Sequence, residues 1–364
     1  MKVTLIGGYW VNVVGIMYSE DLITYDFGEG HPFRGKRFSD FLITFQQLGL
    51  DELPQLKIIQ SRPCSFEDLL LVHNEEYLEI IKQGEKRYES LSLDTPLRPG
   101  MLEAAMNVVG ASLNALRYVI EGNAPFAVGM GGGMHHAFPN SGGGFCIVND
   151  VAICAEYLRK KQGSKRILIL DTDAHYGDGT AKIFYETPEV LFISIHQNPA
   201  TLYPGTGYIR EVGRGEGEGY NVNIPMPVYG NDPSYDLVYS EIVVPLVEEF
   251  KPEIIIRNGG SDPHFSDKLT DLGVSLNGLR RMGAIHREII QSSGSHGISL
   301  IGSGYNPIVL PYGWTSIILG LADINFPLEE PIQPPSCIKD KSILAQTKKV
   351  LEEVKDTHSA YWSF

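Results

Sequence analysis

Short apolar, β-branched runs alternate along this chain with longer segments that carry apolar residues at helical spacing. Six runs are predicted to be buried strands: Val3–Ile6, Pro125–Val128, Ile167–Leu170, Val190–Ile195, Ile254–Ile256 and Ile298–Ile301. Val148–Lys161 and Tyr235–Phe250 are two of the amphipathic, helix-like segments between them. Strands that are apolar throughout and alternate with helices are typical of a parallel sheet covered on both faces. The pattern therefore predicts an α/β fold with a mainly parallel sheet between two layers of helices.

The domain organisation follows from length and composition. The chain has 364 residues, which at about 150 residues per domain allows one large or two modest domains. Composition does not change in a linker-like way before about residue 325, so we expect one continuous domain over residues 1–325. Beyond it, Asn325–Ser336 is rich in proline and expected to be extended, and Lys339–Asp356 has a helical pattern. We expect residues 326–364 to form a strap and a helix that pack on the same domain.

Net charge and cysteine content limit the classes of ligand that we expect the chain to bind and the compartment in which we expect it to fold. Lysine and arginine number 30 against 44 aspartates and glutamates, a net charge of −14. Such a chain repels phosphate backbones, so we expect no direct nucleic-acid ligand, and a cationic ligand is electrostatically easier. No signal peptide is evident at the start, and no apolar run reaches the roughly 18 residues that span a membrane. Four cysteines without a CxxC pair argue against disulfides and a cysteine zinc site, so we expect a cytoplasmic protein.

A polar, glycine-rich cluster follows directly after each of five predicted strands. In chain order these clusters read GMGGGMHHAFPN, DTDAHYGDG, HQN, RNGGSDPHFSD and GSGYNP. In α/β sheets ligands bind beyond the carboxyl ends of the strands, where the loops converge. Five loops that bring histidine, aspartate and tyrosine to one rim therefore indicate an enzyme site.

The cluster after Ile167–Leu170 is a candidate metal site. Asp171, Asp173 and His175 share one side of an extended strand end, because side chains alternate with a period of two. Carboxylates and an imidazole that converge there are costly to bury unless a cation lies between them. A turn with capping aspartates is the alternative interpretation.

One carboxylate and one histidine do not complete a catalytic zinc site, which usually has three protein ligands. Asp262 is the candidate third ligand, and His264 and Asp267 are its competitors in the same loop. Zinc accepts this donor set, and iron(II) or cobalt(II) would as well.

Two adjacent histidines and a tyrosine are candidates for proton transfer and oxyanion binding. His135 and His136 follow a triple glycine and need carboxylates to orient them, so we pair Asp171 with His135 and Asp178 with His136. For either histidine alone, a structural role would be the better interpretation. Tyr305 follows a glycine just past a strand end and can donate to an oxyanion over the metal. An aromatic ring packed on the rim is the alternative.

These clusters resemble the zinc-dependent histone deacetylase family, which includes acetoin-utilisation proteins and acetylpolyamine amidohydrolases. The resemblance runs in the family's order from about Tyr18 to Leu321. It is carried by TYDFGEGHPFRGKR, GGGMHHAFPNSGGGFCIVNDVA, RILILDTDAHYGDGTAKIFYETPEVLFISIH, YPGTGYIREVGRGEGEGYNVNIPM, NGGSDPHFSDKLTDLGVSLNG and GSGYN. It implies an arginase/deacetylase-like fold in a single domain, with deacetylase-like catalytic residues over 1–325.

The resemblance also implies roles for individual residues. Asp173, His175 and Asp262 would bind the metal, His135 would lie behind the attacking water, His136 nearer the leaving nitrogen, and Tyr305 would polarise the carbonyl. Arg37 would lie beneath the metal. The walls of an acyl-lysine tunnel would be Gly144, Phe145, Tyr203 and Leu269. Two structural potassium sites would use Asp171, Asp173, His175 and Ser194, and then Phe184, Thr187, Val190 and Tyr220. Tyr176, Met134, Ser261 and Arg257 depart from what the motifs lead one to expect.

The predicted reaction is hydrolysis of an N-acyl amide such as acetyl-lysine, an acetylated polyamine or another small acetylated amine. Acids of the loop Gln83–Pro99, namely Glu85, Glu89 and Asp94, would meet a cationic substrate, unless the loop is simply solvated. A ureohydrolase of arginase type is one alternative, since DAHYGD resembles its manganese motif. It would need a further histidine and two more aspartates near Asp262. A catalytically silent binder of acyl-lysine or polyamine is the other alternative.

Overall fold

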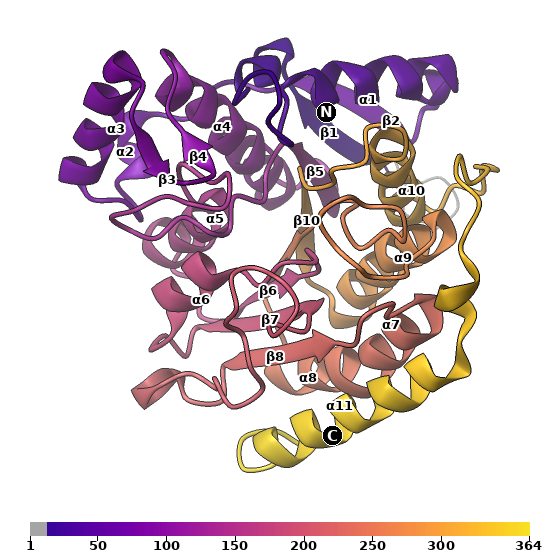
Figure 1. Ribbon diagram of the computed structural model, residues 1–364. Coiled ribbons are helices and arrows are strands. Elements are labelled where there is room, and N and C mark those ends of the chain that lie inside the picture. The colour runs from indigo at the N-terminus through magenta and orange to yellow at the C-terminus, as the bar shows by residue number, and fades with distance from the viewer. Residues whose placement is uncertain (1–12) are drawn as a thin grey trace.

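A parallel sheet runs through the centre of the computed structural model, which describes residues 13–364 (Figure 1). Within those residues the strand order is β2-β1-β5-β10-β9-β6-β7-β8, and every neighbouring pair is parallel. The strands are β1 (Val14–Tyr18), β2 (Leu56–Gln60), β5 (Phe126–Met130), β6 (Ile167–Asp171), β7 (Val190–Gln197), β8 (Asn221–Met226), β9 (Ile254–Asn258) and β10 (His296–Ile301). A separate antiparallel pair is formed by β3 (Ser90–Ser92) and β4 (Thr95–Pro96).

Helices cover both faces of the sheet, which confirms the predicted α/β fold. α4 and α5 pack on one face, and α1, α8, α9 and α10 form a layer on the other (Figure 1). The helices are α1 (Lys36–Gln47), α2 (Phe66–Leu69), α3 (Glu75–Arg87), α4 (Met101–Ile120), α5 (Asp150–Tyr157), α6 (Asp178–Phe184), α7 (Asp232–Val238), α8 (Val244–Phe250), α9 (Leu276–Ser293), α10 (Leu310–Ala322) and α11 (Lys341–His358). The sheet is therefore shielded from water on both sides, as its apolar strands require.

Five of the six predicted strands are confirmed as β5, β6, β7, β9 and β10, and Val3–Ile6 lies outside the described residues. Three strands of the main sheet were not predicted, and neither was the β3–β4 pair. β1 is apolar and buried, β2 is an edge strand with exposed residues, and β8 contains two buried asparagines and a proline. Only β8 is polar enough to depart from the apolar strand pattern, and Asn223 Nδ2 in it donates to the carbonyls of Tyr208 and Glu211.

The two amphipathic segments are helical but not continuous α-helices. The first is α5 followed by the π-helical turn η3 (Leu158–Gln162), and the second consists of α7, the π-helical turn η5 (Tyr239–Val243) and α8. Both begin at an asparagine whose side chain caps the helix, Asn149 for α5 and Asn231 for α7. Periodicity thus predicted the helices, and the capping residues set where they begin.

The C-terminal segment runs along the edge of the molecule. Residues 324–335 form neither helix nor strand, and α11 then packs against β8 and α7 (Figure 1). Thr347 Oγ1 donates to Ser234 Oγ at 2.8 Å, and Trp362 Nε1 donates to the Gly219 carbonyl at 2.7 Å. These contacts hold the helix on the sheet layer. The boundary at residue 325 stays a prediction.

The strand order positions the site. The five strands that precede the polar clusters, β5, β10, β9, β6 and β7, are consecutive neighbours in the sheet. Because they are parallel, their carboxyl ends lie along one edge, and their loops meet there.

Candidate active site

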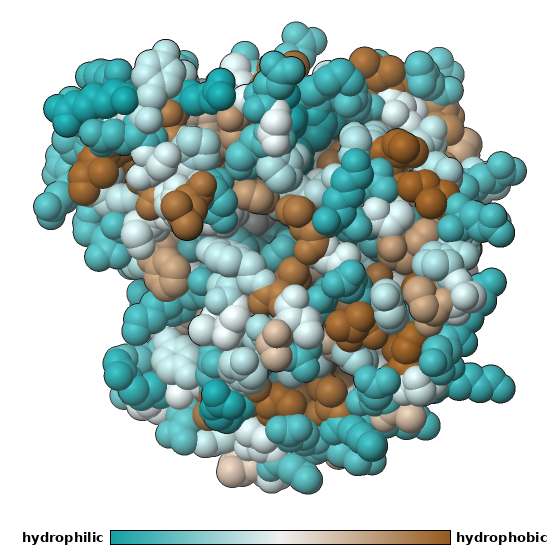
Figure 2. All heavy atoms as spheres, viewed as in Figure 1, coloured by the Kyte–Doolittle hydropathy of each residue, from teal (hydrophilic) through white to brown (hydrophobic). Residues whose placement is uncertain are grey.

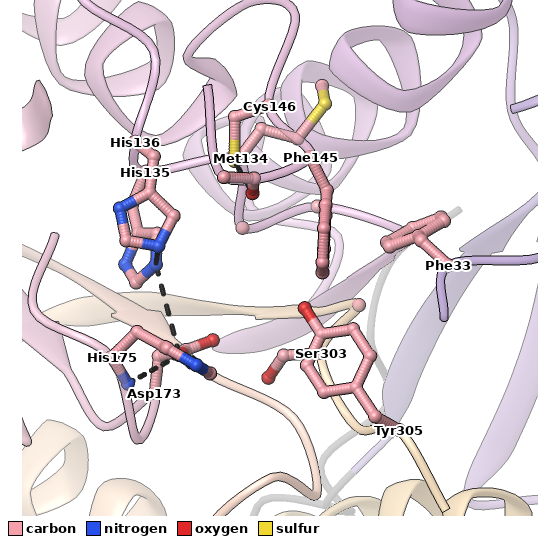
Figure 3. Close-up of a pocket in the computed structure, with 15 residues that line it drawn as sticks. Phe33, Met134, His135, His136, Phe145, Cys146, Asp173, His175, Ser303 and Tyr305 are labelled. Atoms are coloured by element: carbon pink, nitrogen blue, oxygen red, sulfur yellow. Dashed lines mark hydrogen bonds and ion pairs between the residues drawn. The ribbon is translucent and has the colours of Figure 1, made fainter. Parts of the chain in front are cut away.

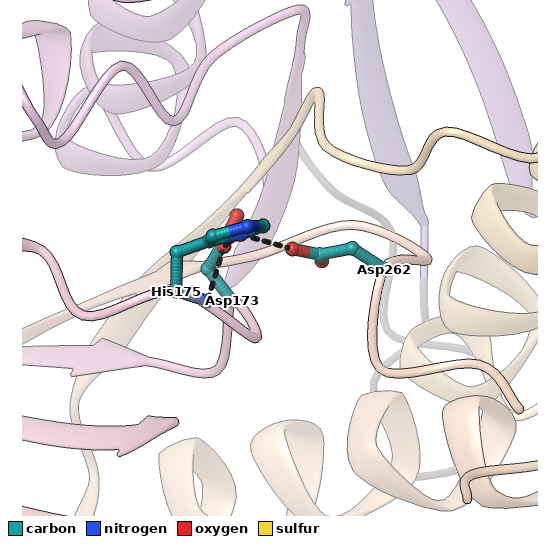
Figure 4. A group of neighbouring side chains, drawn as sticks. All are labelled: Asp173, His175 and Asp262. Atoms are coloured by element: carbon teal, nitrogen blue, oxygen red, sulfur yellow. Dashed lines mark hydrogen bonds and ion pairs between the residues drawn. The ribbon is translucent and has the colours of Figure 1, made fainter. Parts of the chain in front are cut away.

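Asp173, His175 and Asp262 converge where the loops after β6 and β9 meet (Figure 4). β6 and β9 are direct neighbours, with Asp171 opposite Asn258, so the two loops leave the sheet side by side. One potential ligand atom from each side chain lies within 4.8 Å of the others, and all three residues are buried. His175 Nδ1 is 3.1 Å from Asp173 Oδ1 and 3.3 Å from Asp262 Oδ2.

The electrostatics of this group suit a bound cation. Burial and the neighbouring Asp173 carboxylate raise the pKa of Asp262 to about 8. Burial lowers the pKa of His175, but hydrogen bonds to both carboxylates outweigh it and raise this pKa to about 10. Two buried carboxylates therefore repel each other at this spacing, and a divalent cation relieves that repulsion. The donor set fits zinc, iron(II) or cobalt(II).

The two competing ligands are engaged elsewhere. The His264 ring lies 3.1 Å from Glu330 Oε2 and 2.9 Å from Ser266 Oγ, and Asp267 Oδ2 accepts from the Tyr305 backbone N–H at 2.7 Å. Asp262 Oδ1 accepts from Ser303 Oγ at 2.6 Å, which orients the carboxylate from the loop after β10.

The adjacent histidines each lie against one aspartate. His135 Nδ1 is 2.8 Å from Asp171 Oδ2, and His136 Nδ1 is 2.8 Å from Asp178 Oδ1. Their Nε2 atoms are 3.1 Å apart, and both rings line the pocket (Figure 3). Because an ionised carboxylate only accepts, each Nδ1 carries a hydrogen and each Nε2 is left for the pocket.

The two imidazoles differ in acidity. Burial lowers the pKa of His135, but the Asp171 and Asp173 carboxylates outweigh it and raise this pKa to about 9. Burial and the neighbouring His135 lower the pKa of His136, in spite of Asp178. The pair therefore combines one imidazole that holds a proton with one that releases it easily.

Tyr305 faces the histidines across the same pocket, with its hydroxyl directed inward (Figure 3). Its ring centroid lies 5.6 Å from that of Phe145 and 6.3 Å from that of His175. Burial raises the pKa of the Tyr305 phenol well above its usual value, and Asp173 adds to this effect, so the group stays a hydroxyl donor.

Of the predicted tunnel walls, Gly144 and Phe145 line the pocket. Gly144 has φ +55°, and a Cβ there would lie 2.5 Å from His136 Cδ2, so a larger residue would displace the imidazole. The Tyr203 ring lies 5.0 Å from the His136 ring at 77°. Leu269 instead lines a neighbouring surface groove that shares Tyr305 with the pocket.

Arg37 and the rim loop lie around this pocket. The Arg37 guanidinium donates to the carbonyls of Gly302 and Gly304 at 3.0 and 3.1 Å, and burial lowers its pKa to about 10. Of the three rim acids, Asp94 lies behind the pocket wall, where its Oδ1 accepts from the Gly144 N–H at 3.2 Å. Glu85 accepts from the Leu102 N–H, and Glu89 lies beside Arg87. Of these three acids, only Asp94 is hydrogen-bonded to a residue that lines the pocket.

The residues expected to hold potassium form two groups, one where β6 and β7 lie in register and one around the start of β7. Asp171 pairs in register with Ser194, close to Asp173 and His175. Backbone hydrogen bonds link Phe184 to Thr187 and Thr187 to Val190, and the Tyr220 carbonyl accepts from the Phe192 N–H at the start of β7.

Tyr176, one of the departures from the family motif, packs on His196 with ring centroids 4.9 Å apart.

Two polar residues important to the site were not predicted. Asn258 Nδ2 donates to Asp171 Oδ1 at 3.0 Å. Asp150, fully buried on α5, accepts from the backbone N–H groups of Gly133 and Met134 and from Ser112 Oγ, and so anchors the glycine loop. The position of Asn258 just before two glycines was a usable signal. Asp150 gave none, because a helix residue and a distant loop meet only in the folded chain.

The fold and the site together define a parallel α/β protein with a metal-type triad, two His–Asp pairs and a tyrosine at the strand ends. Residues 31–321 match the histone deacetylase domain. A probable deacetylase from Archaeoglobus fulgidus is 37% identical over 363 residues, which cover 96% of this chain and 99% of that protein. The acetoin utilization protein AcuC from Bacillus subtilis is 37% identical over 322 residues, 85% of this chain and 82% of AcuC. The chain therefore belongs to the histone deacetylase family, which confirms the resemblance and supports a deacetylase function.

The fold is shared with a solved structure. The HD domain of HDA15 superposes with a TM-score of 0.84 at 24% identity, covering 97% of this chain and 96% of that one. Among residues 13–364, no helix is long and apolar enough to cross a membrane. On the face seen in Figure 2, hydrophobic residues occur in small groups separated by polar ones.

Proposed function

We propose that this protein is a metal-dependent amidohydrolase that removes the acetyl group from acetyl-lysine or from an acetylated polyamine or small amine. The observation that carries the proposal is the convergence of two His–Asp pairs, a half-buried tyrosine and the Asp173–His175–Asp262 triad on one pocket. A divalent cation held by the triad would supply Lewis acidity that polarises the acyl carbonyl and the attacking water. Zinc is the proposed metal, and iron(II) or cobalt(II) would serve in its place.

The chain's own residues would move the protons and hold the developing charge. Nε2 of His135 or His136 accepts the proton of the attacking water, and His136 then donates a proton to the departing nitrogen. Asp171 and Asp178 each accept from an Nδ1–H and so direct both Nε2 atoms toward the pocket for this exchange. The Tyr305 hydroxyl donates a hydrogen bond to the oxyanion as the carbonyl carbon becomes tetrahedral. The products are acetate and a free amine, and Asp94 at the rim favours a cationic amine.

Two further parts of the proposal concern ions and compartment. The groups around Asp171 and Phe184 would bind potassium and stabilise the strand ends that carry the metal ligands. The four cysteines are free thiols, which supports a reducing, cytoplasmic location.

The deciding experiment compares Tyr305→Phe with the wild type on acetyl-lysine peptides and acetylated polyamines, with metal content measured on the same samples. Loss of the oxyanion donor is expected to lower kcat by about 10²- to 10³-fold at unchanged metal content. Tyr361→Phe is the control, since that hydroxyl contacts Glu218 far from the site. Turnover of Tyr305→Phe close to the wild type would refute the role of this residue.

The same assay separates the alternatives. A ureohydrolase would bind two manganese ions and release urea. Within residues 13–364 the triad is the one group of three or more metal-ligating side chains, which supports a mononuclear site instead. A silent binder would hold acetylated ligands at full metal occupancy without turnover.

A further inference from the structure

Arg257 is a fully buried cation without a counter-ion. It lies on β9 with no exposed surface, and its Nη1 donates to the Gly259 carbonyl at 2.9 Å. Among the described residues Nε and Nη2 make no hydrogen bond of normal geometry, the Tyr239 hydroxyl only approaches the guanidinium, and no carboxylate forms an ion pair with it. An arginine does not give up its proton in a protein, so this charge remains, and an unpaired buried charge is strongly destabilising.

The side chains around Arg257 belong to the helical layer rather than to the catalytic face. Arg257 is in register with Leu170 of β6 and Ser299 of β10, so all three point to the same side of the sheet. On that side Ser299 Oγ is 3.1 Å from His286 Nδ1 of α9, which places this helix over the strand. Tyr235 of α7 and Tyr239 of η5 interact with the guanidinium from the same layer.

These neighbours offer hydrogens and no negative charge. The hydroxyl of Tyr235 and Nε2 of His286 are buried and lack hydrogen-bond partners, and the Tyr239 hydroxyl has only its loose contact with the guanidinium, so the cluster does not satisfy itself. Burial raises the pKa of Tyr239 to about 12, which keeps that phenol protonated and excludes a tyrosinate counter-ion.

The nearest carboxylates do not neutralise Arg257 either. Asp171 and Asp262 act on it electrostatically from a distance. Asp171 is bonded to His135 and Asn258, and Asp262 to His175 and Ser303. Both carboxylates therefore interact with residues of the candidate active site rather than with Arg257.

We propose that Arg257, Tyr239, Tyr235 and His286 form a binding site for one small monovalent anion, with chloride as the simplest occupant. A halide accepts several hydrogen bonds at once and balances the guanidinium charge, which a water molecule does not. The site would stabilise the junction of β9 with α9 and η5, one residue away from the strand end that leads to Asp262. It is independent of the proposed deacetylase reaction.

The test measures thermal unfolding of the metal-loaded protein in sodium chloride and in sodium gluconate at equal ionic strength. The bulky gluconate does not fit a buried halide site. The wild-type midpoint is expected to rise saturably with chloride, by about 3 °C at a concentration 100-fold above Kd. Arg257→Met should abolish the chloride response. Tyr239→Phe should need about fivefold more chloride than the wild type to reach half of the maximal stabilisation. Arg62→Met, at an exposed arginine, should respond like the wild type. Equal midpoints in both salts for the wild type would overturn the proposal.

Diffraction from wild-type crystals in sodium bromide provides a second measurement that does not depend on a variant that folds. An anomalous peak within hydrogen-bond distance of Arg257 Nε and Nη2 is expected. Ordered water alone at Arg257, or bromide only as an adventitious ion on the surface, would overturn the proposal.

Discussion

His135–Asp171 and His136–Asp178 are two copies of one contact with different chemistry. Both Nδ1–Oδ distances are 2.8 Å, yet the Asp171 side chain is fully buried and that of Asp178 is 17% exposed. Asp171 ends the central strand β6 and also accepts from Asn258, whereas Asp178 begins the short helix α6 at the rim. The pKa of His135 is raised and that of His136 lowered. Adjacent, identical residues thus acquire separate roles from the elements that supply their partners.

The largest expected effect removes the metal that both pairs would serve. Asp262→Asn deletes one of three ligands and leaves both His–Asp contacts intact. We expect metal content to fall below about a tenth of the wild-type value and turnover to fall by about 10⁴-fold or more. Metal analysis and a deacetylation assay check this, with Asp271→Asn, an exposed acid in the same loop, as the control. Full metal content and activity in Asp262→Asn would break the assignment.

Replacing the two histidines in turn tests whether their roles differ. His136→Ala should lower kcat by about 10³-fold, because this imidazole is proposed to protonate the leaving nitrogen. His135→Ala should cost about 10²-fold, since His136 is still present to accept the proton of water. Single-turnover assays at matched metal content measure both. Equal losses would show that the two pairs act as one unit.

The aspartates should separate stability from activity. Asp171→Asn presents an amide donor toward Asn258 and the Asp173 N–H in a fully buried position, so we expect it to lower the free energy of unfolding by about 2–3 kcal/mol. Asp178→Asn, at the rim, should cost less than about 1 kcal/mol and still reduce turnover about 10- to 100-fold. Urea denaturation beside the activity assay gives both numbers. A similar loss of stability in the two variants would contradict the contrast in burial.

The smallest effect on activity is expected at a buried histidine without a carboxylate partner, which acts on stability alone. His73 Nε2 accepts from the Asn149 N–H at 2.9 Å, and burial lowers its pKa to about 4. The unfolded chain, with a pKa near 6.5, therefore binds the proton first as pH falls. The contribution of His73 to the free energy of unfolding is therefore complete above about pH 6.5, and it decreases as the pH falls from there toward pH 4.

The matched variant is His73→Gln, which keeps an acceptor and removes the titration. At pH 7 the variant is expected to have a lower free energy of unfolding than the wild type. Urea denaturation should show that this difference becomes smaller by about 2 kcal/mol between pH 7 and pH 5. Parallel pH dependence in the two proteins would show that His73 does not contribute.

Much of the architecture is readable from local pattern. The runs around Ile167, Val190 and Ile254 are continuous and apolar because both faces of a central strand are buried, and they appear as β6, β7 and β9. β8 escaped this reading because Asn223 is buried in it, where its Nδ2 donates to the carbonyls of Tyr208 and Glu211. The hydrogen bonds that allow this asparagine to be buried come from another segment of the chain, so the local sequence pattern does not predict them.

The sequence by itself determined the strands, the polar clusters after them and the residue types that suit a metal and proton transfer. Only the tertiary structure decided that Asp262 rather than Asp267 joins Asp173 and His175, that Leu269 lines a separate groove, and that Arg257 has no charged partner. The reason is physical. Local periodicity reflects whether a face is buried, whereas a partner across the sheet depends on strand order, which is set by the packing of the whole chain.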